Sequence, residues 1–421
     1  MAGAYPITIT VLVDFGNSTT FPVAGTAFTL NSATYGKLNT GFLGSGDTNI
    51  VNVSSQVAKI QIYGGYNLLQ DQFQINQGTI RIYDPNGWWN PQNTSSPYYG
   101  YLTPNRKITF SATYLSVIYP QFAGYINSYN YSFPTSMSVG FVDLMVSDAF
   151  RLLNMASITT VAGAASGQTT GTRINQILDT LNFPTSLRAI DTGDQLVQND
   201  PGTNRIALQA IKNVEWVEQG AFYIDASGVA TFKSRSNVIK TNGATPITSF
   251  ANDGSGLTYS GITFAHDDKL IVNSAVFSNV GGTTQTYTDA VSTAQYFPHT
   301  VTAQSLVGIS DAQALSTATL YVQTRKDTSI RIDNITQDLT TPNYGAGVLA
   351  GLTLDYFSTV KIKNVQSNGS TITKTLQVMG ANYTVTPNSY DITFTTSEPI
   401  VDGFVLNSIT SGILDTSILA G

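Results

Sequence analysis

Side chains that commonly transfer protons are scarce in this sequence. The 421 residues include two histidines, His266 and His299, and three glutamates, Glu215, Glu218 and Glu398. General acid–base catalysis most often uses histidine or a carboxylate whose surroundings shift its pKa. Their small number predicts that the protein is not an enzyme and has no catalytic residues.

The segment His266-Asp267-Asp268 groups three side chains that can bind a metal ion or move a proton. Three adjacent residues at the entry to a strand cannot all face one ligand, and aspartate is common in turns because it bonds to nearby backbone groups. We therefore interpret this segment as a turn. The chain has no cysteine, which excludes disulfides and thiolate metal sites. No metal and no other cofactor is predicted.

Two of the glutamates, Glu215 and Glu218, lie one helical turn apart beside Trp216. Paired carboxylates carry out glycoside hydrolysis, but those enzymes need one carboxylate on each side of the sugar. Two glutamates on one face of one helix do not meet that requirement. We therefore predict that they lie on a solvated helix face.

Five aromatic residues lie in one short, proline-containing stretch: Trp88, Trp89, Tyr98, Tyr99 and Tyr101. Such rings can form a platform on which a sugar stacks, as in a receptor-binding protein. They can equally anchor a loop against its own domain or against a neighbouring subunit, where aromatic residues are enriched. We favour the second reading and take this stretch as a candidate subunit-interface loop.

Strands on both sides hold this loop in place. Residues 79–83 alternate between apolar and polar, which predicts a half-buried strand, and Asp84-Pro85-Asn86-Gly87 predicts a turn. Alternation returns from Lys107, and a further strand over residues 117–126 predicts a hairpin that turns at Leu115-Ser116. The aromatic loop therefore connects two strands of one sheet.

The composition favours a mainly β protein. Hydrophobic residues make up 42% of the chain and charged residues 11%, and 36 glycines and 22 tyrosines accompany many Thr, Ser and Asn residues. Strand and turn formers therefore outweigh helix formers. The net charge of −6 argues against nucleic-acid binding, which depends on Lys and Arg. No signal peptide and no run of about 18 apolar residues occurs, so we expect a protein made in the cytoplasm, without a membrane segment, that stays soluble or joins an assembly.

The order of predicted elements divides the chain into four parts. These are a strand-rich domain (1–145), a small α/β module (146–235), a second strand-rich domain with one helix (236–400) and a C-terminal docking arm (401–421). Three predicted helices begin at the capping residues Asp148, Thr172 and Asp311. A further helix is predicted to start after Asn204, and a hairpin over residues 221–233 follows it.

Several motifs occur in an order that resembles a known family. They are DQFQINQGTIRIYDPNG, NTSSPYYGYLTPNRKITF, YPQFAGYI, VSDAFRLLNMA, GTRINQILDTLNFP, QAIKNVEWVEQGAFYIDASGVATFKSR and the closing LQVMGANYTVTPNSYDITFTTSEP. In this order the chain resembles the hub or minor tail proteins of long-tailed bacteriophages over almost its whole length.

The resemblance implies two β-barrel domains similar to the tail-tube subunit, on either side of the α/β module. It implies a structural hub in the virion, at the tail tip or baseplate, where three copies form a ring that caps the distal end of the tail tube and offers a pseudo-sixfold face to it. The implied partners are further copies of the chain, distal tail and tail-tube proteins, the C-terminus of the tape-measure protein, and tail fibres or tip proteins. DNA would pass through the lumen without sequence-specific binding.

The alternative function is that of a carbohydrate-binding or polysaccharide-degrading tail adhesin. Tail depolymerases usually show the internal repeats of a β-helix and a groove rich in carboxylates. Neither is visible in this sequence, so the hub is the favoured prediction.

Overall fold

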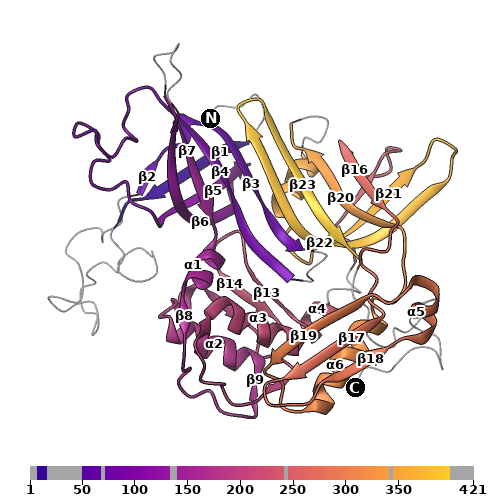
Figure 1. Ribbon diagram of the computed structural model, residues 1–421. Helices are drawn as coiled ribbons and strands as arrows, with labels where there is room; N and C mark the ends of the chain where they lie inside the picture. The colour runs from indigo at the N-terminus through magenta and orange to yellow at the C-terminus, as the bar shows by residue number, and fades with distance from the viewer. Residues whose placement is uncertain are drawn as a thin grey trace.

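The computed structural model describes residues 7–16, 50–67, 72–132, 140–240, 245–340 and 345–398. Figure 1 shows a large β-sheet in the upper part of the view, with its two strand-rich halves side by side, and a part that contains most of the helices below it. The predicted docking arm, 401–421, lies outside the described residues.

The first half of the large sheet contains seven strands. They are β1 (Thr8–Asp14), β2 (Ile50–Asn52), β3 (Val57–Asn67), β4 (Gln72–Asp84), β5 (Arg106–Tyr114), β6 (Val117–Ser132) and β7 (Gly140–Ser147). Alternation along β5 buries Ile108, Phe110, Ala112 and Tyr114, which confirms the alternating strand predicted from Lys107. The predicted turn at Leu115-Ser116 is also confirmed, because Tyr114 pairs with Val117 across it.

The second half contains six strands. They are β15 (Thr248–Ala251), β16 (Gly261–Ala265), β20 (Arg331–Asp338), β21 (Thr359–Val365), β22 (Thr371–Thr386) and β23 (Ser389–Ser397). Strand β22 pairs antiparallel with β3, with Tyr383 opposite Ile62 and Val385 opposite Ile60. This pairing joins the halves into one 13-stranded sheet.

The two halves repeat one strand order. The first has the strand order β1-β5-β6-β7-β4-β3, and the second has the order β15-β21-β22-β23-β20-β16, in which strands of the same rank along the chain hold the same place. One strand differs in direction, because β1 is antiparallel to β5 whereas β15 is parallel to β21. In each half a 16-residue strand, β6 or β22, pairs first with the strand before it and then with the strand after it. Each long strand has a bulge at the same step, after Ile126 in β6 and after Val378 in β22.

The lower part begins with a run of short elements. They are α1 (Ala149–Met155), β8 (Ser157–Ile158), β9 (Gln168–Thr169), α2 (Thr170–Thr180), β10 (Arg188–Ile190), β11 (Leu196–Val197), β12 (Arg205–Ile206), α3 (Ala207–Glu218), β13 (Ala221–Ile224), β14 (Ala230–Lys233) and α4 (Arg235–Lys240). A later segment adds β17 (Ser274–Asn279), β18 (Gln285–Thr288), α5 (Ala290–Tyr296), β19 (Thr300–Leu306) and α6 (Asp311–Gln323).

These two groups of elements share one hydrophobic core. Trp216 of α3 contacts Phe277 of β17 and Tyr321 of α6, with ring centroids 5.6 and 5.3 Å apart. Residues on both sides of position 235 therefore pack together, while β15, β16 and β20–β23 belong to the core of the large sheet. The domain boundaries at 145, 235 and 400 stay a prediction.

The helix starts agree only in part with those expected. Asp148 caps α1, as predicted, by accepting a hydrogen bond from the Phe150 amide at 3.0 Å. Thr169, not Thr172, caps α2, and Ser310, not Asp311, caps α6. Asp311 instead accepts hydrogen bonds from Thr283, a residue distant in sequence, which the local pattern could not reveal.

The prediction of two barrel domains holds in part. The protein is mainly β and has two strand-rich halves, but within the described residues the path of the large sheet runs open from β16 to β2. The second strand-rich region contains most of α4, together with α5 and α7 (Ala346–Thr353), besides the single helix expected there. Among the described residues, no helix is both long and apolar enough to cross a membrane.

Candidate functional site

The aromatic loop packs mainly onto its own half of the sheet. Trp89 and Tyr98 are buried, and their ring centroids lie 5.2 Å apart. Phe15 covers both of them, at 6.1 Å from Trp89 and 5.1 Å from Tyr98. These two rings are therefore part of the hydrophobic core and are not available to a sugar or to another subunit.

Hydrogen bonds fix the start of this loop. The two carboxylate oxygens of Asp84 accept from the backbone amides of Trp88 at 2.8 Å and Trp89 at 3.1 Å. The Trp89 indole Nε1 donates to Gln56 Oε1 at 3.0 Å, which satisfies the polar atom of a buried ring. The sequence identified the loop but could not show which of its rings turn inward.

Two of the predicted residues do reach the surface. Tyr99 is 50% exposed and Tyr101 is 40% exposed, whereas Trp88 is half-buried beside Tyr98. The surface that this loop offers to a partner therefore consists mainly of two tyrosines, and not of the five aromatic residues grouped by the sequence.

The prediction of a solvated face for Glu215 and Glu218 is wrong. Both side chains are buried. Glu215 forms an ion pair with Lys212 at 2.7 Å and accepts from the Phe222 amide at 2.8 Å. The helix that carries them lies between other layers, so it has no solvated face at these positions.

Glu218 organises the turns around the end of α3. Its carboxylate accepts from Thr170 Oγ1 at 2.6 Å and from the backbone amides of Asp194, Gln195 and Arg235 at 2.8–3.1 Å. Burial raises the pKa of this carboxyl, and the four donors oppose that shift. A carboxylate with its oxygens occupied by four donors holds loops together and has no free lone pair directed at a substrate.

The segment at His266 forms a turn, as interpreted. Asp267 Oδ1 accepts from the Lys269 amide at 3.1 Å and from Arg331 Nη1 at 3.0 Å, and these contacts lower the pKa of Asp267. His299 Nε2 lies 3.7 Å from the Asp268 carboxylate. Among the described residues no group of three or more His, Asp or Glu side chains is placed to hold a metal ion.

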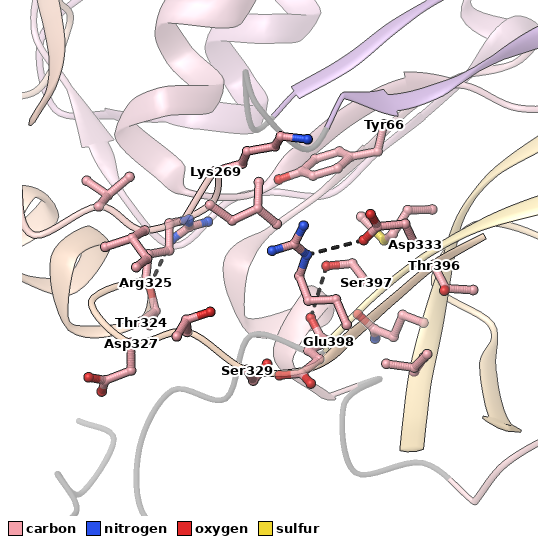
Figure 2. Close-up of a pocket in the computed structure, with 18 of the residues that line it drawn as sticks. Tyr66, Lys269, Thr324, Arg325, Asp327, Ser329, Asp333, Thr396, Ser397 and Glu398 are labelled. Atoms are coloured by element: carbon pink, nitrogen blue, oxygen red, sulfur yellow. Dashed lines mark hydrogen bonds and ion pairs between the residues drawn. The ribbon is translucent and has the colours of Figure 1, made fainter. Parts of the chain in front are cut away.

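A cleft of about 370 Å³ lies between the large sheet and the lower part. Figure 2 shows Arg325 and Asp327 on one side of it and Asp333 and Thr396 on the other. Arg325 stacks on the Tyr321 ring at 4.0 Å, and Arg331 is held between Asp267 and Asp333. Both positively and negatively charged side chains line this cleft.

The sequence contains one indication of this cleft, a local concentration of charged residues that the predictions above did not use. Five of the ten residues from 324 to 333 are charged, in a chain with only 11% charged residues. Such a local concentration indicates a region where charges pair or meet a partner.

A second cavity, of about 310 Å³, is lined by Asn76, Asp148, Asp355 and Tyr356. Burial raises the pKa of Asp148 to about 7, while backbone donors from Asn76 and Phe150 oppose the shift. A carboxyl with such a pKa is often catalytic. Here its two oxygens accept the amides of Asn76 at 2.9 Å and Phe150 at 3.0 Å, so Asp148 caps a helix and ties it to β4.

No protein-family profile matches this sequence, and no curated protein matches it significantly. Solved structures do match. A tail protein from Neisseria meningitidis MC58 has a TM-score of 0.56 at 10% identity, over 84% of this chain and 94% of its own length. The 43 kDa tail protein of prophage MuSo2 from Shewanella oneidensis has a TM-score of 0.54 at 13% identity, over 93% of this chain and 99% of its own. The chain is therefore similar in fold to phage tail proteins over most of its length, as the sequence motifs predicted.

Proposed function

We propose that the protein is a structural hub of a phage tail tip or baseplate. Three copies would form a ring that caps the distal end of the tail tube, joins it to fibres or tip proteins and surrounds the channel for DNA ejection. The repeated strand order of the two sheet halves carries this proposal. The fold shared with two phage tail proteins supports it.

Three copies of a chain with two similar halves present six similar sheets around one axis. Such a ring matches a sixfold tube while the ring itself has only threefold symmetry. In this proposal each half corresponds to one tube-like domain, the residues between them (146–235) to a connecting module, and 401–421 to an arm that docks on a neighbour.

The junction between halves indicates how copies would meet. Within one chain, β22 pairs with β3 on the side away from β23. By the shared strand order, β6 corresponds to β22 and β16 to β3. In the described residues, β16 pairs only with β20, and the second part of β6 pairs only with β7. We place the second part of β6 of one copy against β16 of the next.

The matching bulges give the register of this contact. Ile126 in β6 corresponds to Val378 in β22, so Tyr131 corresponds to Tyr383. Ile80 pairs with Leu144 and Ile335 with Phe394, which places Phe264 where the first half has Ile62. Tyr131 of one copy would then lie opposite Phe264 of its neighbour, as Tyr383 lies opposite Ile62.

Cysteine crosslinking tests this arrangement, because the chain has no cysteine of its own. Opposed residues of antiparallel strands have Cα atoms about 4.5–5.5 Å apart, within the roughly 4.4–6.8 Å of disulfides. The variant Tyr131→Cys/Phe264→Cys should give covalent dimers and trimers, with no larger species, after mild oxidation. The matched variant Tyr383→Cys/Ile62→Cys should crosslink within one chain and serves as the control.

Efficient crosslinking in the control variant without any intermolecular product in the test variant would reject the edge contact. A protein that stays monomeric and never enters tails would reject the hub itself. A hub also needs no catalytic step, so the purified protein should not turn over host polysaccharide or peptidoglycan.

The exposed tyrosines of the aromatic loop are proposed to contact an adjacent tail component. The variant Tyr99→Ser/Tyr101→Ser should fold normally and assemble poorly into tails, since it changes only surface rings. Normal tails that fail to adsorb to cells would instead favour the adhesin function for this loop. Phage particles assembled with the variant, scored for tail assembly and for adsorption, separate the two results.

A further inference from the structure

Phe297, at the end of α5, combines two unfavourable features. Its side chain is 81% exposed, the largest value among the exposed large hydrophobic residues of the described chain. Its backbone lies at φ 68° and ψ 165°, a region essentially restricted to glycine. A residue that is both strained and exposed does not stabilise the monomer, which points to a role outside it.

The surrounding structure holds this conformation in place. Asn273 is buried, its Nδ2 donates to the Phe297 carbonyl at 2.7 Å, and its Oδ1 accepts from the His299 amide at 2.8 Å. The backbone amides of Asn273 and Ser274 both donate to the His299 carbonyl at 3.1 Å. The ring is therefore presented on a rigid support, and a pre-ordered aromatic side chain loses little entropy when it binds.

The same chain has a cavity suited to an aromatic ring. It measures about 340 Å³. Ile177, Val214, Val280 and Val307 form an apolar wall of this cavity, and polar side chains such as Gln209 and Asn213 line the rest. An apolar cavity of about 150 Å³ already accepts benzene. Arg205, paired with Asp200, lies at the same cavity, and a guanidinium favours the face of an aromatic ring.

We propose that Phe297 of one copy inserts into this cavity of a second copy. Figure 1 shows α5 at one side of the lower part and α2, which carries Ile177, toward the other, so one chain cannot make this contact with itself through these elements. A contact between two different surfaces of identical chains is heterologous and can close a ring. The assignment rests on the proposed ring and adds a second contact to it, below the sheet edges.

Two surface variants test the contact. Phe297→Ser removes the ring, and Val280→Glu places a charge at the 39% exposed wall of the cavity. Each should weaken self-association about 30-fold, the loss expected for a buried aromatic anchor. Val291→Ser, at a 77% exposed residue of the same helix, is the control and should associate like the wild type.

Mixing the two variants gives the sharpest result. A Val280→Glu copy keeps an intact Phe297, and a Phe297→Ser copy keeps an intact cavity, so each one-to-one pair should regain one complete contact and the mixture should associate more strongly than either variant alone. Light scattering on each variant and on the mixture measures this. Wild-type trimers together with unchanged trimers of both variants would overturn the inference and leave the hub standing. A monomeric wild type would overturn both.

Phe297→Gly separates a loss of contact from a loss of folding. Glycine adopts the observed backbone angles freely, so this variant should keep a Tm at or above that of the wild type and still lose association. Association of Phe297→Gly at wild-type strength would overturn the inference.

Discussion

The two halves of the large sheet share a strand order but differ in what connects their strands. In the first half, β4 continues into β5 through the aromatic loop, whereas in the second half the connection from β20 to β21 carries α7. The hairpin from β3 to β4 is short, but its counterpart from β16 to β20 spans residues 266–330 and carries β17–β19, α5 and α6. The sheet is the repeated scaffold, and the connections are where the halves acquire different roles.

The residues that follow the last strand of each half also differ in their roles. Strand β7 ends at Ser147 and is followed by Asp148, and β23 ends at Ser397 and is followed by Glu398. Asp148 is 1% exposed and caps α1. Glu398 is exposed and pairs with Lys374 at 2.5 Å. One acidic position is therefore structural in the first half and lies on the surface in the second.

The largest effect on stability is expected in the loop between β4 and β5, because part of this loop belongs to the hydrophobic core of the first half. Trp89→Ala should lower the free energy of unfolding by about 3–5 kcal/mol, because it removes a fully buried ring and leaves a cavity. Urea unfolding measures this, and Tyr99→Ala, at an exposed ring of the same loop, should change it by no more than about 0.5 kcal/mol. Equal effects of the two changes would mean that the loop does not belong to the core.

The pH dependence of stability should differ between the two acidic positions. The folded state holds the Asp148 proton up to about pH 7, whereas an unfolded chain releases it near the ordinary pKa of 3.8. The stability linked to this group is therefore greatest at acidic pH and falls as the pH rises from about 4 to about 7, by up to about 4 kcal/mol.

The variant Asp148→Asn cannot titrate, so the difference in stability between wild type and variant should change over this pH range. Chemical unfolding at a series of pH values measures that difference. Glu398→Gln, at the corresponding exposed position, should give a difference that stays within about 1 kcal/mol. A flat difference for Asp148→Asn would show that this carboxylate is ionised throughout.

Local sequence patterns were sufficient for many of the strands. The strand predicted over residues 79–83 lies within β4, and the β5–β6 hairpin turns at the predicted residues. Alternation and turn residues act over a few positions, so a single segment contains the whole signal. The same applies to the Asp148 cap.

Long-range contacts explain what the sequence did not show. The Gly64 amide donates to Asn382 Oδ1 at 3.1 Å, and the two residues are 318 positions apart in sequence. No local sequence pattern predicts that β3 pairs with β22. Likewise, Trp89 is buried because Phe15 covers it and Gln56 accepts a hydrogen bond from its indole, and both residues are distant from Trp89 in sequence. Glu215 and Glu218 were misplaced for the same reason, since elements from elsewhere in the chain cover α3.

The junction between the halves provides the last prediction. At this point Gly65, with φ 103°, lies against β22 so closely that an added Cβ would be 2.5 Å from Gly380 Cα and 2.8 Å from the Met379 carbonyl oxygen. Gly65→Ala should therefore cost about 2–3 kcal/mol, since it combines an unfavourable φ with a clash between two backbones. Gly369→Ala, at φ 85° with open space around it, should cost only about 1 kcal/mol. Urea unfolding of both variants isolates the clash, and equal costs would mean that the two halves do not pack against each other at this glycine pair.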